Sequence, residues 1–301
     1  GLKPTYGTVS RYGLIAMSSS LDQIGPLTKS VEDAALVFDA IKGPDTHDSS
    51  SATANREPVQ ATIRQSIAGM KIGVPKEYFI KGLDGRIEKA VRNACDILRD
   101  AGAEIVDISL PYAPYALSVY YIICPAEVSA NLSRFDGIRY GYQSKDAHNL
   151  IETYCRSREE GLGPEVRRRI MLGSYVLAAG YYDAYYKKAQ GVRQMVRRDF
   201  DNAFRTVDCI VTPTSPTPAF HIGEKISDPL TLYLEDIFTV SANIAGIPGL
   251  VVPAGFVEEE GVQLPVGLQF LGRHFDEATI LRAGYAYEQA TEWHTKKSPL
   301  S

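Results

Sequence analysis

Three consecutive serines, Ser18, Ser19 and Ser20, are the most tempting nucleophiles in this sequence of 301 residues. A serine hydroxyl becomes nucleophilic only beside a general base and an oxyanion hole, and the surrounding residues show neither. The five histidines are scattered, and none has a cysteine or carboxylate at metal-ligand spacing. The sequence also has no GxSxG elbow, P-loop or GxGxxG fingerprint. We therefore expect the serine run to form a structural turn, and we expect no metal site.

Composition and charge narrow the class of protein. Hydrophobic residues make up 45% of the chain and charged residues 23%, values typical of soluble globular proteins. No apolar run approaches the roughly 18 residues that span a membrane, and no signal peptide is visible. The four cysteines form no CxxC pair, which predicts free thiols in a reducing compartment and favours the cytoplasm. The net charge of −4 argues against this chain binding nucleic acid by itself.

The charge is unevenly distributed along the chain. Residues 156–205 contain eleven Lys and Arg against six Asp and Glu. A solvated helix face explains such an excess, and so does a contact surface for an acidic partner. The sequence leaves both interpretations open.

The elements that must position any site follow an α/β pattern. Residues 71–75 are predicted to form a buried strand, residues 86–102 an amphipathic helix and residues 104–110 a second strand, parallel to the first. Further strands are predicted at residues 209–213, 250–256 and 266–271, with an acidic loop at 258–261 between the last two. Further helices are predicted from the Ser30 cap to residue 41, at 112–134 with a break at Pro125, from Pro164 to about 204, at 231–245, and after the Asp276 cap. These elements predict a mixed sheet flanked by helices, in a single domain over residues 1–301.

The first 28 residues, GLKPTYGTVSRYGLIAMSSSLDQIGPLT, have glycines and prolines at spacings that fix a backbone path. This segment resembles the one that follows the catalytic serine in the amidase signature family, and the similarity extends to about Trp293. The resemblance implies the family's α/β fold, truncated at its N-terminal side. It also implies that the Ser–cisSer–Lys triad precedes Gly1, so that no catalytic residue lies in this chain and the chain alone is inactive.

Within that family, residues 173–190 (GSYVLAAGYYDAYYKKAQ) look most like the glutaminase subunits of tRNA-dependent amidotransferases. A site for free glutamine needs a cation for the α-carboxylate and an anion for the α-ammonium. The motif EVRRRIMLG at residues 165–173 matches Arg169 to the carboxylate-binding arginine, and DPLTLYLEDI at 228–237 matches Asp236 to the ammonium-binding acid. The segment SVYY at 118–121 matches Tyr120 to a tyrosine of the pocket. The residues alone would equally allow a solvated arginine, a helix-surface acid and a core aromatic.

The resemblance also implies partners. The parent protein would release ammonia from glutamine and pass it to a partner, the B subunit, that amidates Glu-tRNA(Gln) or Asp-tRNA(Asn), with a small third partner, the C subunit. ATP and Mg would be bound by the amidating partner, which alone would contact tRNA, and no cofactor is expected in this chain. Two alternatives remain: an independent amidase signature hydrolase of other amides, and a non-catalytic fragment that only packs against partner subunits.

Overall fold

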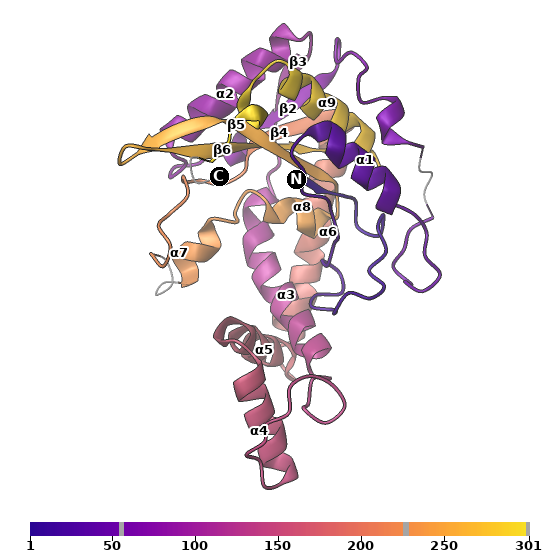
Figure 1. The fold of residues 1–301 in the computed structure, drawn as a ribbon, viewed down its shortest axis with the longest axis vertical. Helices are drawn as coiled ribbons and strands as arrows, with labels where there is room; N and C mark the ends of the chain where they lie inside the picture. Colours follow the sequence, from indigo (N-terminus) through magenta and orange to yellow (C-terminus); the bar gives the residue numbers. More distant parts are fainter. Residues whose placement is uncertain (54–56, 225–228, 299–301) are drawn as a thin grey trace. The chain divides into compact units, whose positions relative to one another are not determined.

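The computed structural model of the chain divides into two compact units (Figure 1). It describes residues 1–53, 57–224 and 229–298. The first unit comprises residues 1–12, 23–117 and 194–301, and the second comprises residues 13–22 and 118–193. The expectation of a single domain over residues 1–301 stays a prediction, because compactness alone does not decide whether either unit folds by itself.

A mixed six-stranded sheet in the order β1-β5-β6-β4-β2-β3 forms the centre of the first unit. Its strands are β1 (Leu2–Lys3), β2 (Lys71–Pro75), β3 (Glu104–Ile108), β4 (Cys209–Pro213), β5 (Gly249–Glu259) and β6 (Val262–Leu271). Strand β2 is parallel to β3 and β4, whereas β6 is antiparallel to β4 and β5, and β1 is antiparallel to β5. Helix α2 (Gly85–Asp100) connects β2 to β3 in the chain, which confirms the predicted parallel unit. The fold is α/β, as the sequence predicts.

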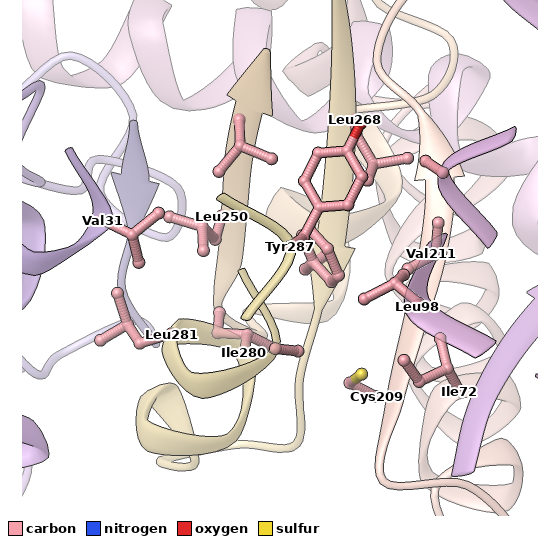
Figure 2. Packing of buried hydrophobic residues seen from close by; sticks show 14 of the residues in the cluster. Val31, Ile72, Leu98, Cys209, Val211, Leu250, Leu268, Ile280, Leu281 and Tyr287 are labelled. Atoms are coloured by element: carbon pink, nitrogen blue, oxygen red, sulfur yellow. The ribbon is translucent and has the colours of Figure 1, made fainter. Parts of the chain in front are cut away.

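The main hydrophobic core lies between this sheet and the helices α1 (Val31–Ile41), α2 and α9 (Glu277–Gln289) (Figure 1). Five apolar residues of α2 recur at helical spacing and are buried: Ile87, Val91, Ala94, Cys95 and Leu98. Figure 2 shows Leu98 and Tyr287 from the helices beside Val211 and Leu268 from the strands. The helix starts at Ser30 and Asp276 also agree with the sequence, since both side chains accept a hydrogen bond from a backbone N–H of the first turn.

The hairpin of β5 and β6 is longer than predicted. Glu258 and Glu259 were expected in an acidic loop, but they belong to β5 and pair with residues 263 and 262 of β6. Only Glu260 and Gly261 form the turn, with φ of 49° and 80°. Positive φ at both positions is the signature of a two-residue type I′ turn, whose twist matches that of the strands.

The second unit is helical. Its elements are α3 (Ala116–Leu132, starting in the first unit), α4 (Leu150–Gly161), α5 (Pro164–Leu177), a π-helical turn η4 (Asp183–Lys187) and α6 (Lys188–Ala203, ending in the first unit). The predicted break at Pro125 is wrong, because α3 continues through it. Buried residues on both sides of this proline, including Ile123 and Val128, pack well enough to offset its local cost. The predicted continuous helix to residue 204 is also wrong, because residues 178–182 interrupt it, with an extended backbone at Ala178 and φ of 89° at Gly180.

The helix predicted at residues 231–245 is likewise divided, into α7 (Pro229–Leu234) and α8 (Val240–Ala245). Short 3₁₀ turns occur at Val59–Ala61, Lys76–Tyr78, Ala113–Tyr115 and Trp293–Thr295. All four cysteines are free: Cys95, Cys124 and Cys209 are buried and Cys155 is exposed. Over the described ranges, none of the helices is long and apolar enough to cross a bilayer. The same residues contain no cluster of three metal-ligating side chains.

Candidate functional site

The helices α3 and α5 of the second unit approach each other closely at Gly173. A Cβ atom on Gly173 would lie 1.9 Å from the carbonyl oxygen of Pro125 and 2.7 Å from Cβ of Ser129. The hydroxyls of Ser129 and Ser174 are 3.0 Å apart across the same contact. Glycine is therefore required here, because any side chain would separate the helices. Arg169 lies one helical turn before Gly173 and so shares the face of α5 that meets α3.

At this contact the structure brings two of the three predicted binding residues together. The Nη1 atom of Arg169 donates to the hydroxyl oxygen of Tyr120 at 3.1 Å and contacts Sγ of Cys124 at 3.7 Å. On the other side of the guanidinium, Nε donates to Oε1 of Glu165 at 3.0 Å. Its carbon Cζ lies 6.0 Å from the ring centroids of Tyr120 and Tyr121, within the range of a cation–π contact.

The surroundings of Arg169 keep it charged and oriented. Its side chain is 17% exposed, whereas Arg167 and Arg168 are exposed. Burial by itself lowers the pKa of Arg169, but the hydrogen bonds to Glu165 and Tyr120 outweigh it, and the net shift of the pKa is upward. Burial raises the pKa of Tyr120 to about 12, so its hydroxyl keeps its proton at neutral pH. The pair thus offers a guanidinium and a neutral phenol, both of which bind carboxylates.

Asp236 belongs to the first unit. It follows the end of α7, and its backbone carbonyl accepts hydrogen bonds from the hydroxyl and the N–H of Thr239. The exposed side chain of Asp236 lines a cavity of about 330 Å³ together with Glu235, Thr214 and Gly267. Residue 228, which starts the motif that singled out Asp236, lies outside the described residues. The acid therefore borders a concave surface that could hold a small cation.

Two residues of the arginine site were not singled out from the sequence. Cys124 lies one turn after Tyr120 on α3, and Glu165 lies one turn before Arg169 on α5. The spacing of four residues on a predicted helix is the signal that could have identified both. The sequence did not show which of the three consecutive arginines faces α3, because that depends on how the two helices pack.

The serine run forms no catalytic constellation in the described residues. Ser18 and Ser20 bind the carboxylate of Glu127 through a hydroxyl and a backbone N–H, respectively. Arg193 donates to both the hydroxyl and the carbonyl of Ser20. These contacts match the structural turn expected from the sequence.

Residues 1–281 match the family model for Amidase, and the chain belongs to this family. Among curated proteins, it is 54% identical over 301 residues to the A subunit of glutamyl-tRNA(Gln) amidotransferase from Chloroflexus aggregans. It is 55% identical over 300 residues to the protein of the same name from Trichlorobacter lovleyi. Both alignments cover 100% of this chain and 61% of the relative, so the chain spans about three fifths of the length of these proteins.

The comparison with solved structures points to the same protein as the comparison with curated sequences. The crystal structure of the A subunit of glutamyl-tRNA(Gln) amidotransferase from Thermotoga maritima aligns with a TM-score of 0.75 and 40% sequence identity. The alignment covers 96% of this chain and 57% of the crystallised one. The predicted amidase signature fold is therefore confirmed, and the chain is similar to part of the A subunit of this amidotransferase.

Proposed function

We propose that this chain forms the glutamine-recognising part of the glutaminase subunit of a tRNA-dependent amidotransferase. The complete subunit would hydrolyse the side-chain amide of glutamine and release ammonia. The observation that carries the proposal is the half-buried guanidinium of Arg169 beside the neutral hydroxyl of Tyr120. An amidase for apolar amides has no need for such a carboxylate-binding pair.

In this proposal the α-carboxylate of glutamine binds Arg169 and Tyr120. Arg169 Nη1 already donates to the oxygen of Tyr120, so the proton of that hydroxyl is left to be donated to another acceptor. Asp236 binds the α-ammonium through its carboxylate, at the cavity that it lines. Each of these two groups carries or offers the charge complementary to one end of the glutamine zwitterion, and an apolar amide would use neither.

The experiment compares three ligands on the amidotransferase complex that contains this chain: L-glutamine, L-glutaminamide and 4-carbamoylbutanoate. Glutaminamide lacks the α-carboxylate, and 4-carbamoylbutanoate lacks the α-ammonium. Binding is measured by isothermal titration calorimetry on the unmodified complex and on Arg169→Ala. We expect Arg169→Ala to weaken binding of L-glutamine by about 2–5 kcal/mol, because an ionised ligand group loses its partner. Its affinity for glutaminamide should hardly change.

Arg167→Ala is the matched control, since Arg167 is an exposed arginine of the same helix. It should bind L-glutamine as the unmodified complex does. The variant Asp236→Asn should weaken binding of L-glutamine and of glutaminamide but leave binding of 4-carbamoylbutanoate unchanged. Equal affinity of Arg169→Ala and the unmodified complex for L-glutamine would exclude this function and favour a hydrolase of other amides.

The partners follow from the same proposal. Ammonia that escapes into water is protonated and diluted, so the glutaminase is expected to form a tight complex with the amidating B subunit and the small C subunit. The B subunit would use ATP and Mg to activate the side-chain carboxylate of Glu-tRNA(Gln) or Asp-tRNA(Asn), and this chain would meet tRNA only through it. The complex would function in the cytoplasm as a heterotrimer of protein synthesis. Co-purification of this chain with two further subunits tests this assembly.

The last part of the proposal concerns this chain by itself. No segment of residues 1–301 resembles the segments that carry the Ser–cisSer–Lys triad in the amidase signature family. A protein of this sequence alone should therefore release no ammonia from glutamine. A coupled glutamate dehydrogenase assay measures that release. Glutaminase activity of this chain alone would show that it contains a different catalytic group.

A further inference from the structure

Two arginines share one carboxylate in the first turns of helix α5. Glu165 accepts a hydrogen bond from Nε of Arg169 at 3.0 Å through Oε1, and one from Nη1 of Arg168 through Oε2. Spacings of four and three residues place both arginines beside Glu165 on the surface of the helix. Each oxygen of the carboxylate therefore has its own arginine, and Arg169 is bonded to only one of the two.

The guanidinium of Arg169 consequently keeps one nitrogen for another acceptor. Nε is bonded to Glu165, and Nη1 to the hydroxyl of Tyr120 and, at 3.7 Å, to the sulfur of Cys124. Nη2 makes no hydrogen bond within the part of the chain that the structure describes. It is also not among the described polar atoms that are both buried and unpartnered, so solvent reaches it. Nη2 is thus a donor that a dissolved ligand can bind.

A similar pair on helix α2 has no second arginine beside it. Glu88 and Arg92 have the same spacing of four residues, but the residue three positions after the glutamate is Val91. Here Oε1 of Glu88 lies 3.0 Å from Nε and 2.9 Å from Nη2 of Arg92. Nε and Nη2 point the same way and form a fork that fits a carboxylate. The glutamate on α2 thus takes both nitrogens of its arginine, whereas the glutamate on α5 takes only Nε.

We infer that Arg168 is a positioning residue for recognition of the glutamine α-carboxylate, because it holds Glu165 away from Nη2 of Arg169. Nη2 and the hydroxyl of Tyr120 are then two donors for the two oxygens of the ligand carboxylate. The inference rests on the proposed function, which assigns that carboxylate to Arg169 and Tyr120. Arg168 acts through Glu165 and needs no contact with the ligand.

The first test compares L-glutamine with L-glutaminamide on the amidotransferase complex, by isothermal titration calorimetry. In Arg168→Ala, the carboxylate of Glu165 loses one arginine and can compete with the ligand for Nη2. An exposed ion pair contributes little free energy, so L-glutamine should bind about fivefold more weakly. L-Glutaminamide lacks the α-carboxylate, and its affinity should stay within about twofold. Equal losses for both ligands would indicate a general defect of the site and overturn the inference.

Three further variants separate competition by Glu165 from the mere loss of a positive charge. Arg167→Ala removes the same charge from the neighbouring exposed position and should not change L-glutamine binding. Arg168→Lys keeps a cation for Oε2 of Glu165 and should retain most of the affinity. In a Glu165→Gln background, Arg168→Ala should cause no further loss, since the competing carboxylate is gone. The same loss in Arg167→Ala, or a loss that persists in the Glu165→Gln background, would contradict the inference.

A structural readout without ligand keeps this inference separate from the proposed function. In a crystal structure of the complex with Arg168→Ala, a carboxylate oxygen of Glu165 should lie about 3 Å from Nη2 of Arg169. Glu165 bonded to Nε alone would refute the inference whatever the ligand is. If Glu165 takes both nitrogens but Arg169→Ala binds L-glutamine as tightly as the unmodified complex, the proposed function fails. The assignment of Arg168 to glutamine recognition then fails with it.

Discussion

Replacing Gly173 by alanine is expected to separate helices α3 and α5. A Cβ atom on Gly173 would lie 1.9 Å from the Pro125 carbonyl oxygen, whereas real Cβ atoms essentially never come closer than 3.0 Å, so α5 must retreat by about 1 Å. The obstacle is backbone, and no change of rotamer relieves it. Overpacking that moves a backbone costs about 3 kcal/mol, and the better helix propensity of alanine returns about 1 kcal/mol. We expect a net loss of about 2 kcal/mol in the free energy of unfolding.

Urea unfolding followed by circular dichroism measures this loss. Gly191→Ala is the matched control, because Gly191 is a helical glycine of the same unit with no atom within 4 Å of its virtual Cβ. That variant should gain about 0.5–1 kcal/mol from helix propensity alone. Gly173→Ala should also bind L-glutamine more weakly, since Arg169 moves away from Tyr120 with α5. If Gly173→Ala proved as stable as Gly191→Ala, the close packing of α3 and α5 would be refuted.

Two further predictions concern the first unit. Hydrogen bonds, chiefly from the Ser50 hydroxyl, lower the pKa of Asp48 from 3.8 to about 2. A lowered pKa of an acid means that its contribution to stability is complete above pH 3.8 and is lost as the pH falls towards 2. Asp48→Asn should therefore flatten the acid limb of a plot of melting temperature against pH, and an unchanged limb would show that Asp48 is not held in this way. At the hairpin turn, Glu260 has φ of 49°, a conformation that a type I′ turn requires and that asparagine adopts more readily than glutamate. Glu260→Asn should therefore raise the free energy of unfolding by about 0.4–1 kcal/mol, measured by urea titration. Destabilisation by this substitution would count against the type I′ turn.

The sequence predicts best those elements whose local signals and tertiary environment agree. The Ser30 cap, the short buried strand at residues 71–75 and the glycine after α2 have one consistent interpretation each, and the structure confirms it. Pro125 is the opposite case. Its local signal favours a break, but buried neighbours on both sides keep α3 intact. A short stretch of sequence does not show how much tertiary packing stabilises a helix, so a prediction from local signals alone is wrong at positions such as Pro125.

In the candidate site, too, some features follow from local sequence and others depend on tertiary packing. Composition cannot distinguish Arg169 from its two neighbours, and only the resemblance to a family singled it out. The physical reason for its position is Gly173, which allows α5 to meet α3 and turns Arg169 towards Tyr120. The cavity at Asp236 depends on residues as distant as Thr214 and Gly267, and no sequence spacing reveals that.

The distribution of cysteines has a practical consequence. Burial raises the pKa of Cys95 to about 11, and Cys124 and Cys209 are also buried, so these three thiols should react slowly with alkylating reagents. Cys155 is the exposed one and lies on α4 in the second unit. A maleimide dye should therefore attach at one position of the natural sequence, without any mutagenesis. Fluorescence from that position offers a direct way to follow assembly with partner subunits.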